Sequence, residues 1–282
     1  MSSTTQANLF ALGAIALWAS LATLGVALSH VPAFALTGLA LIIGSVPTWG
    51  HWRQWRVSPR ALALGVYGLF GFHFLLFIAL RHAPPVQANL VNYLWPLFIV
   101  VLAPLLLPGL RLRPVHVLAA GLGFFGAGLA ILGGRSVEAA WAWGYVPALG
   151  SALVWATFSL GSRRMAQTGQ GFPTAALGLF GLISGVLALA CHVWLEPAVQ
   201  LSLKDVLLIV VMGLGPLGGA FLLWDRALKL GDPRTIGVLS YLTPLASTLL
   251  LIVLTGRALT VWIGLAALLI AGAALLAVRA RH

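Results

Sequence analysis

Charged residues are scarce in this sequence. Only 7% of its 282 residues are Asp, Glu, Lys or Arg, whereas 61% are hydrophobic and the mean hydropathy is +1.03. Soluble domains have roughly 25% charged residues, so this composition excludes an ordinary soluble protein. Apolar stretches of about 20 residues recur along the whole length, as transmembrane helices require. We therefore expect a multi-pass membrane protein, whose net charge of +11 reflects its orientation in the bilayer rather than binding to nucleic acid.

Acidic residues are the rarest charged type. Asp225 is the one candidate for a carboxylate inside the membrane, and because Lys229 follows four residues later, we expect a local ion pair between them. Proton-coupled export of cationic drugs normally needs a membrane-embedded acid, and the first span has none, which argues against a multidrug antiporter. The five acids are Glu138, Glu196, Asp205, Asp225 and Asp232.

Signatures of catalysis and of metal binding are also missing. The single cysteine, Cys191, excludes an intramolecular disulfide and a cysteine-based metal motif, and the isolated histidines lack zinc-ligand spacing. The sequence contains neither HExxH nor a nucleophile elbow, and its GxGxxG match at 121–126 lies inside an apolar stretch with no strand before it. We expect no enzyme, no cofactor and no metal. Residues 1–8 lack the features of a removable signal peptide.

One pattern occurs twice in the chain. Tyr93-Leu94-Trp95-Pro96 and Tyr241-Leu242-Thr243-Pro244 each lie in a long apolar segment, at an offset of 241 − 93 = 148 residues. The prolines at 85 and 233 repeat that offset, and segment 11–20 resembles segment 148–157, with tryptophan at 18 and 155. An internal repeat of this length predicts two related halves, residues 1–137 and 138–282.

About ten spans account for the whole length, because a span with its loop uses roughly 25 to 30 residues. We expect them at roughly 8–29, 32–50, 61–81, 85–108, 114–134, 140–162, 172–194, 205–228, 233–255 and 259–278. With the N-terminus in the cytoplasm, most Lys and Arg residues fall on the inner side, where positive charge is favoured. Both termini are therefore expected in the cytoplasm. The inner set is Arg53, Arg56, Arg60, Arg111, Arg113, Arg163, Arg164, Lys229, Arg234, Arg279 and Arg281, against Arg81, Arg135, Lys204 and Arg257 outside.

Each half has an odd number of spans, so the halves enter the membrane in opposite directions. Inverted repeats of this kind are typical of secondary transporters, whose substrate site lies near the bilayer midplane, where the halves meet and helices are interrupted. The expected fold is an all-α integral membrane protein with two inverted five-helix repeats. A proline within a helix frees the carbonyl four residues earlier. The expected hinge or kink positions are Gly71, Pro96, Pro216, Gly219 and Pro244.

Polar and aromatic residues gather on the expected inner faces of several spans. On one continuous helix the polar and aromatic residues between 89 and 96 would share an arc of about 160°, and residues 237–248 would do so in the matching helix. Polar side chains of membrane helices avoid lipid. Tryptophans near span ends are explained by the interfacial belt, but those at 18, 95 and 155 lie deeper. The expected substrate-binding residues are Trp18, His73, Asn89, Asn92, Tyr93, Trp95, Trp155, Ser240 and Tyr241.

His73 leaves two interpretations open. It lies near the middle of the third span, where an ionisable group is costly and usually functional. The alternative is a neutral, hydrogen-bonded histidine with a structural role.

An amino acid would suit such a site. Aromatic faces attract an ammonium group and stack on an aromatic side chain. Amides, hydroxyls and freed backbone groups can hydrogen-bond the carboxylate and the ammonium. Because the zwitterion has no net charge, the site requires no buried charge.

With its two halves, Trp18-Ala19-Ser20 and Tyr93-Leu94-Trp95-Pro96, the chain resembles the drug/metabolite transporter superfamily and its ten-span EamA-type members. Through His73, the 93–96 motif and Trp155, it resembles most the bacterial aromatic amino-acid exporters of the inner membrane. The resemblance implies two EamA-like repeats, a central cavity lined by these residues, and alternating access. Phe72 and Leu76 leave the His73 helix without a tyrosine hydroxyl there, so a range wider than aromatic amino acids is expected.

The resulting expectation is a monomeric inner-membrane transporter that exports amino acids, with the lipid bilayer as its surroundings and no nucleic-acid partner. One alternative is a proton-coupled multidrug or metabolite exporter of the same superfamily. Another is a passive channel.

Overall fold

The computed structural model describes residues 2–132, 141–255 and 260–280, which contain helices and no strand. The boundary expected between residues 137 and 138 lies outside this part of the chain, as do Glu138, Arg135, Arg257 and Arg281. The first half contains α1 (Ser3–Ala19), α2 (Leu21–Ala27), α3 (Ala33–Ser45), η1 (Val46–Trp55), α4 (Pro59–Val66), η2 (Tyr67–Gly71), α5 (Phe72–His82), α6 (Pro85–Asn92), α7 (Trp95–Leu106) and α8 (Pro114–Leu132). The second contains α9 (Tyr145–Gln167), α10 (Ala176–Leu195), α11 (Leu203–Leu214), η3 (Gly215–Gly219), α12 (Ala220–Leu230), α13 (Pro233–Leu239), α14 (Leu242–Thr255) and α15 (Val261–Arg279).

These elements join end to end into membrane-length segments. Within the described ranges, 9 of them are long and apolar enough to cross a membrane. The tenth expected span is α9, which is 23 residues long but carries serines and two arginines. Because α9 packs against α5, α6, α7 and α12, its polar side chains can face protein instead of lipid. The prediction of an all-α membrane protein is confirmed.

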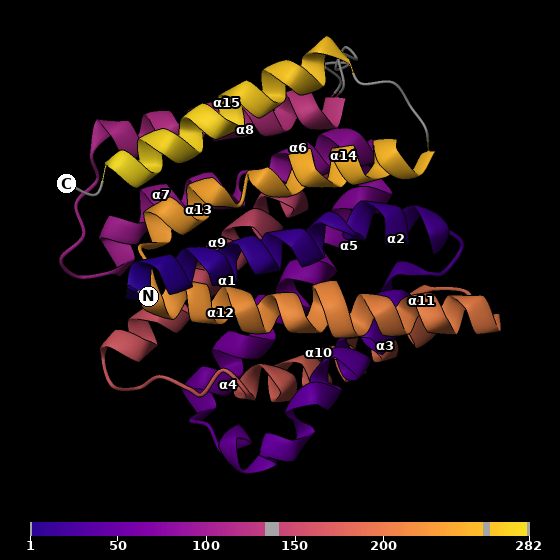
Figure 1. The fold of residues 1–282 in the computed structure, drawn as a ribbon. Coiled ribbons are helices and arrows are strands. Elements are labelled where there is room, and N and C mark those ends of the chain that lie inside the picture. The colour runs from indigo at the N-terminus through magenta and orange to yellow at the C-terminus, as the bar shows by residue number, and fades with distance from the viewer. Residues whose placement is uncertain (1, 133–140, 256–259, 281–282) are drawn as a thin grey trace.

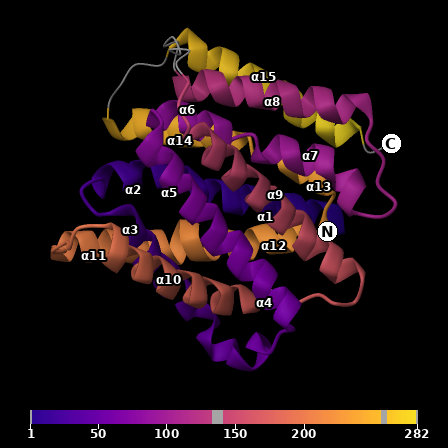
Figure 2. The same ribbon diagram turned by 180° about the vertical axis from the view of Figure 1, so that it is seen from behind.

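The two halves are inverted copies of one another. Helices α1 and α9, which begin the halves, run in opposite directions through the bundle (Figures 1 and 2). Each packs mainly against the other half: α1 lies against α12 and α14, and α9 lies against α5 and α7. The equivalent pairs α3–α10 and α8–α15 complete the arrangement, and both ends of the chain lie at the same end of the bundle (Figure 1).

Both halves interrupt their third span with a π-helical segment at the same place. The segments Tyr67–Gly71 and Gly215–Gly219 differ by 215 − 67 = 148 residues, the offset of the sequence repeat. Single π turns inside α-helices leave backbone carbonyls without their usual donors and often occur at functional sites. The fourth span and its counterpart are also interrupted, between α6 and α7 and between α13 and α14.

Glycines allow α3 to pack closely against two other helices, α10 and α11. An added Cβ at Gly185 in α10 would lie 2.8 Å from the carbonyl oxygen of Gly38 in α3. A Cβ at Gly44 would lie 2.7 Å from the carbonyl oxygen of Gly213 in α11. Small residues at helix contacts of this kind are typical of membrane proteins, in which close backbone approach replaces the hydrophobic effect.

The third span of each half carries, at its C-terminal end, a basic residue that makes both an ion pair and a cation–π contact. The two basic residues occupy equivalent positions of the repeat. At the end of α5, Arg81 donates to Glu196 (2.7 Å) and lies over the ring of Phe34 (5.4 Å). Near the end of α12, Lys229 donates to Asp225 (2.6 Å) and lies over the ring of Phe172 (4.4 Å). The pair Asp225–Lys229 is the local ion pair expected from the sequence.

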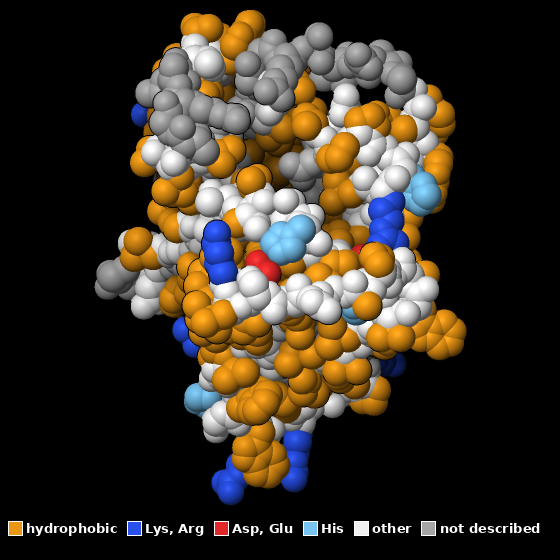
Figure 3. All heavy atoms as spheres, turned by 90° about the vertical axis from the view of Figure 1, so that its right-hand side faces the viewer, with side chains coloured by type: hydrophobic (Ala, Val, Ile, Leu, Met, Phe, Trp, Pro, Cys, Tyr) orange, Lys and Arg blue, Asp and Glu red, His pale blue; other side chains and the backbone are white. Residues whose placement is uncertain are grey.

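The surface is largely apolar along the length of the helices. Seen from the right-hand side of Figure 1, charged and histidine side chains form a row across a mostly hydrophobic face (Figure 3). The ion pairs Arg81–Glu196 and His30–Asp205 belong to this end of the bundle. Exposed apolar side chains elsewhere, such as Leu105, Phe125 and Leu268, are suited to contact with lipid tails.

Candidate functional site

Five aromatic rings from both halves meet in the centre of the bundle. Four of them are the indoles of Trp18, Trp95, Trp155 and Trp224, and the fifth is the phenyl ring of Phe221. We call this group the indole cluster; all five residues are buried. The ring centroids of Trp18 and Trp155 are 5.9 Å apart, and those of Trp95 are 6.3 Å from Trp18 and 5.5 Å from Trp224. Mostly edge-to-face geometry at such distances is favourable for aromatic pairs.

These rings come from four helices, two in each half. Trp18 of α1 and Trp155 of α9 occupy equivalent positions, because each lies on the first helix of its half. Trp95 comes from the start of α7, and Phe221 and Trp224 come from α12. The site therefore forms only where the two inverted halves cross.

The two π segments provide hydrogen-bond acceptors to aromatic N–H groups. Trp18 Nε1 donates to the carbonyl oxygen of Pro216 in η3 (3.1 Å). His73 Nδ1 lies 2.6 Å from the carbonyl oxygen of Leu69 in η2, so the nitrogen must act as the donor. These bonds satisfy carbonyls that hydrocarbon could not.

His73 is buried beside the indole cluster. Its ring centroid is 6.4 Å from that of Phe221 and 6.1 Å from that of Phe77. Nδ1 is engaged by its own helix, as the structural interpretation expects, and Nε2 is the nitrogen that remains for a substrate, so both interpretations stay open.

The remaining expected site residues lie farther out. Asn92 is buried and accepts a hydrogen bond from Ser151 Oγ of α9 (2.8 Å), whereas Asn89 and Tyr93 are partly buried on α6 and at the following turn. The chain leaves the helix between Asn92 and Trp95, so residues 89–96 do not share the single arc that a continuous helix would give them.

In the second half the equivalent residues turn away from the cluster. Ser240 Oγ donates to the carbonyl oxygen of Gly237 (2.6 Å). Tyr241 belongs to a separate apolar cluster with Ala127 and Ile270, and its ring occupies the space beside Gly123 of α8. The Ser240 carbonyl, expected to be freed by Pro244, accepts the backbone N–H of Thr243 instead (3.0 Å).

The expected kink positions coincide with the interruptions of the helices. Gly71 ends η2, Pro216 and Gly219 lie within η3, and Pro96 and Pro244 lie in the first turns of α7 and α14.

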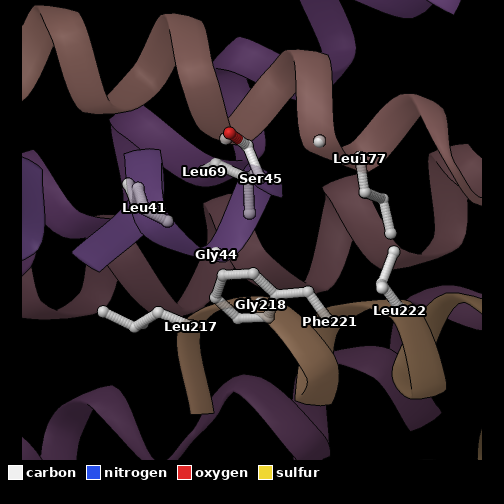
Figure 4. A pocket seen from close by; sticks show the side chains of 11 residues that line it. Leu41, Gly44, Ser45, Leu69, Leu177, Leu217, Gly218, Phe221 and Leu222 are labelled. Atoms are coloured by element: carbon white, nitrogen blue, oxygen red, sulfur yellow. The ribbon is translucent and has the colours of Figure 1, made fainter. Parts of the chain in front are cut away.

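Two narrow hollows flank Phe221. One is lined by leucines and glycines of α3, α10, η2 and η3, with Ser45 as its one hydroxyl, and that hydroxyl donates to Ile42 O (2.6 Å) (Figure 4). The other lies against the indole cluster and is lined by Trp155, Phe221 and Trp224 together with Ser159, Ser162 and Asp225. The second hollow is lined by aromatic rings, hydroxyl groups and a carboxylate, so it offers both stacking and hydrogen-bonding groups to a ligand.

Phe221 and Trp224 were absent from the expected site residues. The signal was present, because Phe221 is 148 residues after His73 and Trp224 follows it by one helical turn. Among the described residues, no group of three or more His, Cys, Asp or Glu could hold a metal ion.

The sequence matches the EamA-like transporter family over residues 5–132 and 142–279, one match for each half. It is 38% identical over 305 residues to the aromatic amino acid exporter YddG of Ancylobacter novellus, covering 99% of this chain and 100% of that protein. A solved crystal structure superimposes with a TM-score of 0.90 and 38% sequence identity, covering 100% of both chains. The family and this relative are transporters, not enzymes. The chain therefore belongs to the EamA-like transporter family, as a multi-pass membrane protein built from two inverted repeats.

Proposed function

We propose that this protein exports amino acids, aromatic ones included, from the cytoplasm across the bacterial inner membrane. The observation that carries the proposal is the indole cluster at the crossing of the two halves. An aromatic side chain that enters between these rings replaces ring–ring contacts with equivalent ones, each worth about 0.5–1.5 kcal/mol. The likeness to an aromatic amino acid exporter supports the same substrate class.

Trp18, Trp95 and Trp155 would form the aromatic walls in this proposal. Asn89, Asn92, Tyr93 and His73 would supply hydrogen bonds from the first half. Tyr241 is left out, because its ring packs against α8. Aliphatic amino acids would bind in the same place with fewer ring contacts.

Transport would proceed by alternating access in a monomer with both termini in the cytoplasm. The half-helices α5 and α12 would pivot at η2 and η3, and α7 and α14 would pivot at the interruptions before Pro96 and Pro244. Support for this movement comes from the interruptions, since each removes regular helix hydrogen bonds at the depth of the site.

The alternative of proton-coupled drug export receives less support. It requires a carboxylate that gives up its cation when it takes up a proton, whereas the cation paired with Asp225 is Lys229, a fixed residue of the same helix.

Uptake of labelled tryptophan into proteoliposomes tests the proposal. Trp95→Ala and Trp155→Ala should each abolish saturable uptake without preventing folding, because each removes a wall of the cluster. Trp194→Ala, at a residue 85% exposed on α10, is the matched control and should transport normally. Uptake that is unchanged in both cluster variants would contradict the site. Counterflow distinguishes carrier from channel, since flux that rises linearly with concentration would indicate a pore.

A further inference from the structure

A buried carboxylate forms part of the wall beside the indole cluster. Asp225 is 4% exposed and lies one residue after Trp224, and it borders the same hollow as Trp155 and Phe221. The other acids that the structure describes, Glu196, Asp205 and Asp232, lie at or near helix ends and border neither hollow.

The hydrogen bonds of Asp225 are divided unequally between its two carboxylate oxygens. Oδ2 accepts from Lys229 Nζ (2.6 Å) and from Thr174 Oγ1 (2.7 Å), whereas Oδ1 accepts from Ser162 Oγ alone (2.8 Å). An ionised carboxylate has about four acceptor positions. Oδ1 can therefore accept one more N–H donor, and Asp225 borders the hollow that the rings line.

A hydroxyl donor lies beside it on α9. Ser159, which precedes Ser162 by three residues and so shares its helix face, accepts a hydrogen bond from Trp224 Nε1 (3.1 Å). Because the indole N–H fills an acceptor position of Ser159 Oγ, the hydroxyl hydrogen of Ser159 can still be donated to an anion.

The charges of this wall already balance. Lys229 Nζ is held by Asp225, by the carbonyl oxygen of Phe172 (2.8 Å) and by the Phe172 ring. A zwitterion adds no net charge to a neutral ion pair, whereas a lone amine or a lone acid would bring an unpaired charge into a low-dielectric site.

We propose that Asp225 binds the α-ammonium group of the substrate at Oδ1, with Lys229 as the fixed counter-charge that selects zwitterions. This inference rests on the proposed function and adds to it the residue that recognises the amino-acid backbone. The side-chain ring of the substrate lies among the indole rings, and its carboxylate accepts a hydrogen bond from Ser159.

Three ligands with one indole ring test this assignment. L-Tryptophan has both charges, tryptamine has only the ammonium, and indole-3-propionate has only the carboxylate. Equilibrium binding of each is measured on the purified protein in lipid nanodiscs. In Asp225→Asn, affinity for tryptophan and tryptamine should fall about 10- to 100-fold, as expected for loss of a charge-assisted hydrogen bond, whereas binding of indole-3-propionate should be kept or strengthened.

Lys229→Gln should change the affinity for tryptamine in the opposite direction to Asp225→Asn. It leaves the wall with a net negative charge, so tryptamine should gain affinity relative to tryptophan. The double variant Asp225→Asn/Lys229→Gln has no unpaired charge and serves if a single variant does not fold; it should lose the preference for ammonium ligands. Asp232→Asn, the same change at the start of α13, is the control and should bind all three ligands as the wild type does.

Equal changes for all three ligands in these variants, or no change, would show that Asp225 is only a structural cross-link, and would overturn the assignment. A wild-type protein that binds none of the three would refute the proposed function and this inference with it. Failure confined to the variants would leave the proposed function standing.

Discussion

At the scale of single residues, the centre of the protein depends on aromatic N–H groups that bond to backbone carbonyls. Trp18 and His73 bond to carbonyls that belong to the two π segments, one in each half. These side chains therefore serve two purposes: they contribute rings to the site, and they donate hydrogen bonds to backbone carbonyls that lipid could not satisfy.

Replacement of Trp18 by phenylalanine separates these two purposes. The ring is kept in part, but the carbonyl of Pro216 loses its donor. An unsatisfied buried acceptor costs roughly 1–3 kcal/mol, so Trp18→Phe should lower the free energy of unfolding by about that amount. Thermal unfolding of the purified protein measures the change, with Trp262→Phe at an exposed position as the control. A melting temperature equal to that of the wild type would show that the Trp18–Pro216 bond contributes nothing.

Residue patterns predicted part of this site. The likeness of segment 11–20 to segment 148–157 and the depth of the tryptophans were enough to group Trp18, Trp95 and Trp155. They were not enough to place Tyr241, because helical periodicity gives the face of a residue but not the helix that packs there. For Tyr241 that helix is α8, where Gly123 leaves room for the ring.

At the scale of helices, α3 and α10 pack closely against one another beside the π segments of the third and eighth spans. The contact depends on Gly185, whose hydrogen faces the backbone of Gly38. A β-carbon there would need the two helices to move apart.

The matching experiment compares two glycines of similar helical position. Gly185→Ala should destabilise the protein, because the new methyl group would lie 2.8 Å from the Gly38 carbonyl oxygen. Gly272→Ala in α15 meets nothing within 4 Å, and it should leave stability equal or raise it by roughly 0.5–1 kcal/mol through better helix propensity. Melting temperatures in one detergent decide the comparison, and equal values for both variants would contradict the packing argument.

Hydropathy predicted the positions of the helices. The prolines and glycines predicted the regions in which the helices are interrupted, but not the residues at which they end. Pro96 and Pro244 marked the correct region, yet α6 ends at Asn92 and α13 ends at Leu239, and the chain becomes helical again at Trp95 and Leu242, just before each proline. The π segments at 67–71 and 215–219 contain glycines, which signal flexibility without specifying an extra residue in the turn. Local composition indicates where a helix can break, and the tertiary contacts decide how.

At the scale of the whole molecule, the inverted halves determine which side of the membrane each end of the chain faces. Both chain ends lie at the same end of the bundle (Figure 1). Fusion of a reporter that fluoresces only in the cytoplasm should therefore give a signal at the N-terminus and at the C-terminus alike, as the excess of inner Lys and Arg predicts. A reporter that fluoresces at one terminus only would refute an even number of spans.

The symmetry of the fold does not extend to the site. Trp95 of the first half packs against three other indoles, whereas its counterpart in the second half is Thr243, which is buried without a ring contact to the cluster. The ends of α5 and α12 each place a basic side chain over a phenylalanine ring, but the acid that pairs with it is Glu196 in one case and Asp225 in the other. The two halves share the arrangement of their helices, but they do not contribute the same side chains to the site.

The matched π segments also bear on how the two halves would move together. Each third span has its π turn at the same residue once the halves are aligned by their offset. Because the halves are inverted, bending at one segment would be opposite in sense, relative to the membrane, to bending at the other. A single kind of joint would then open one side of the bundle while it closes the other.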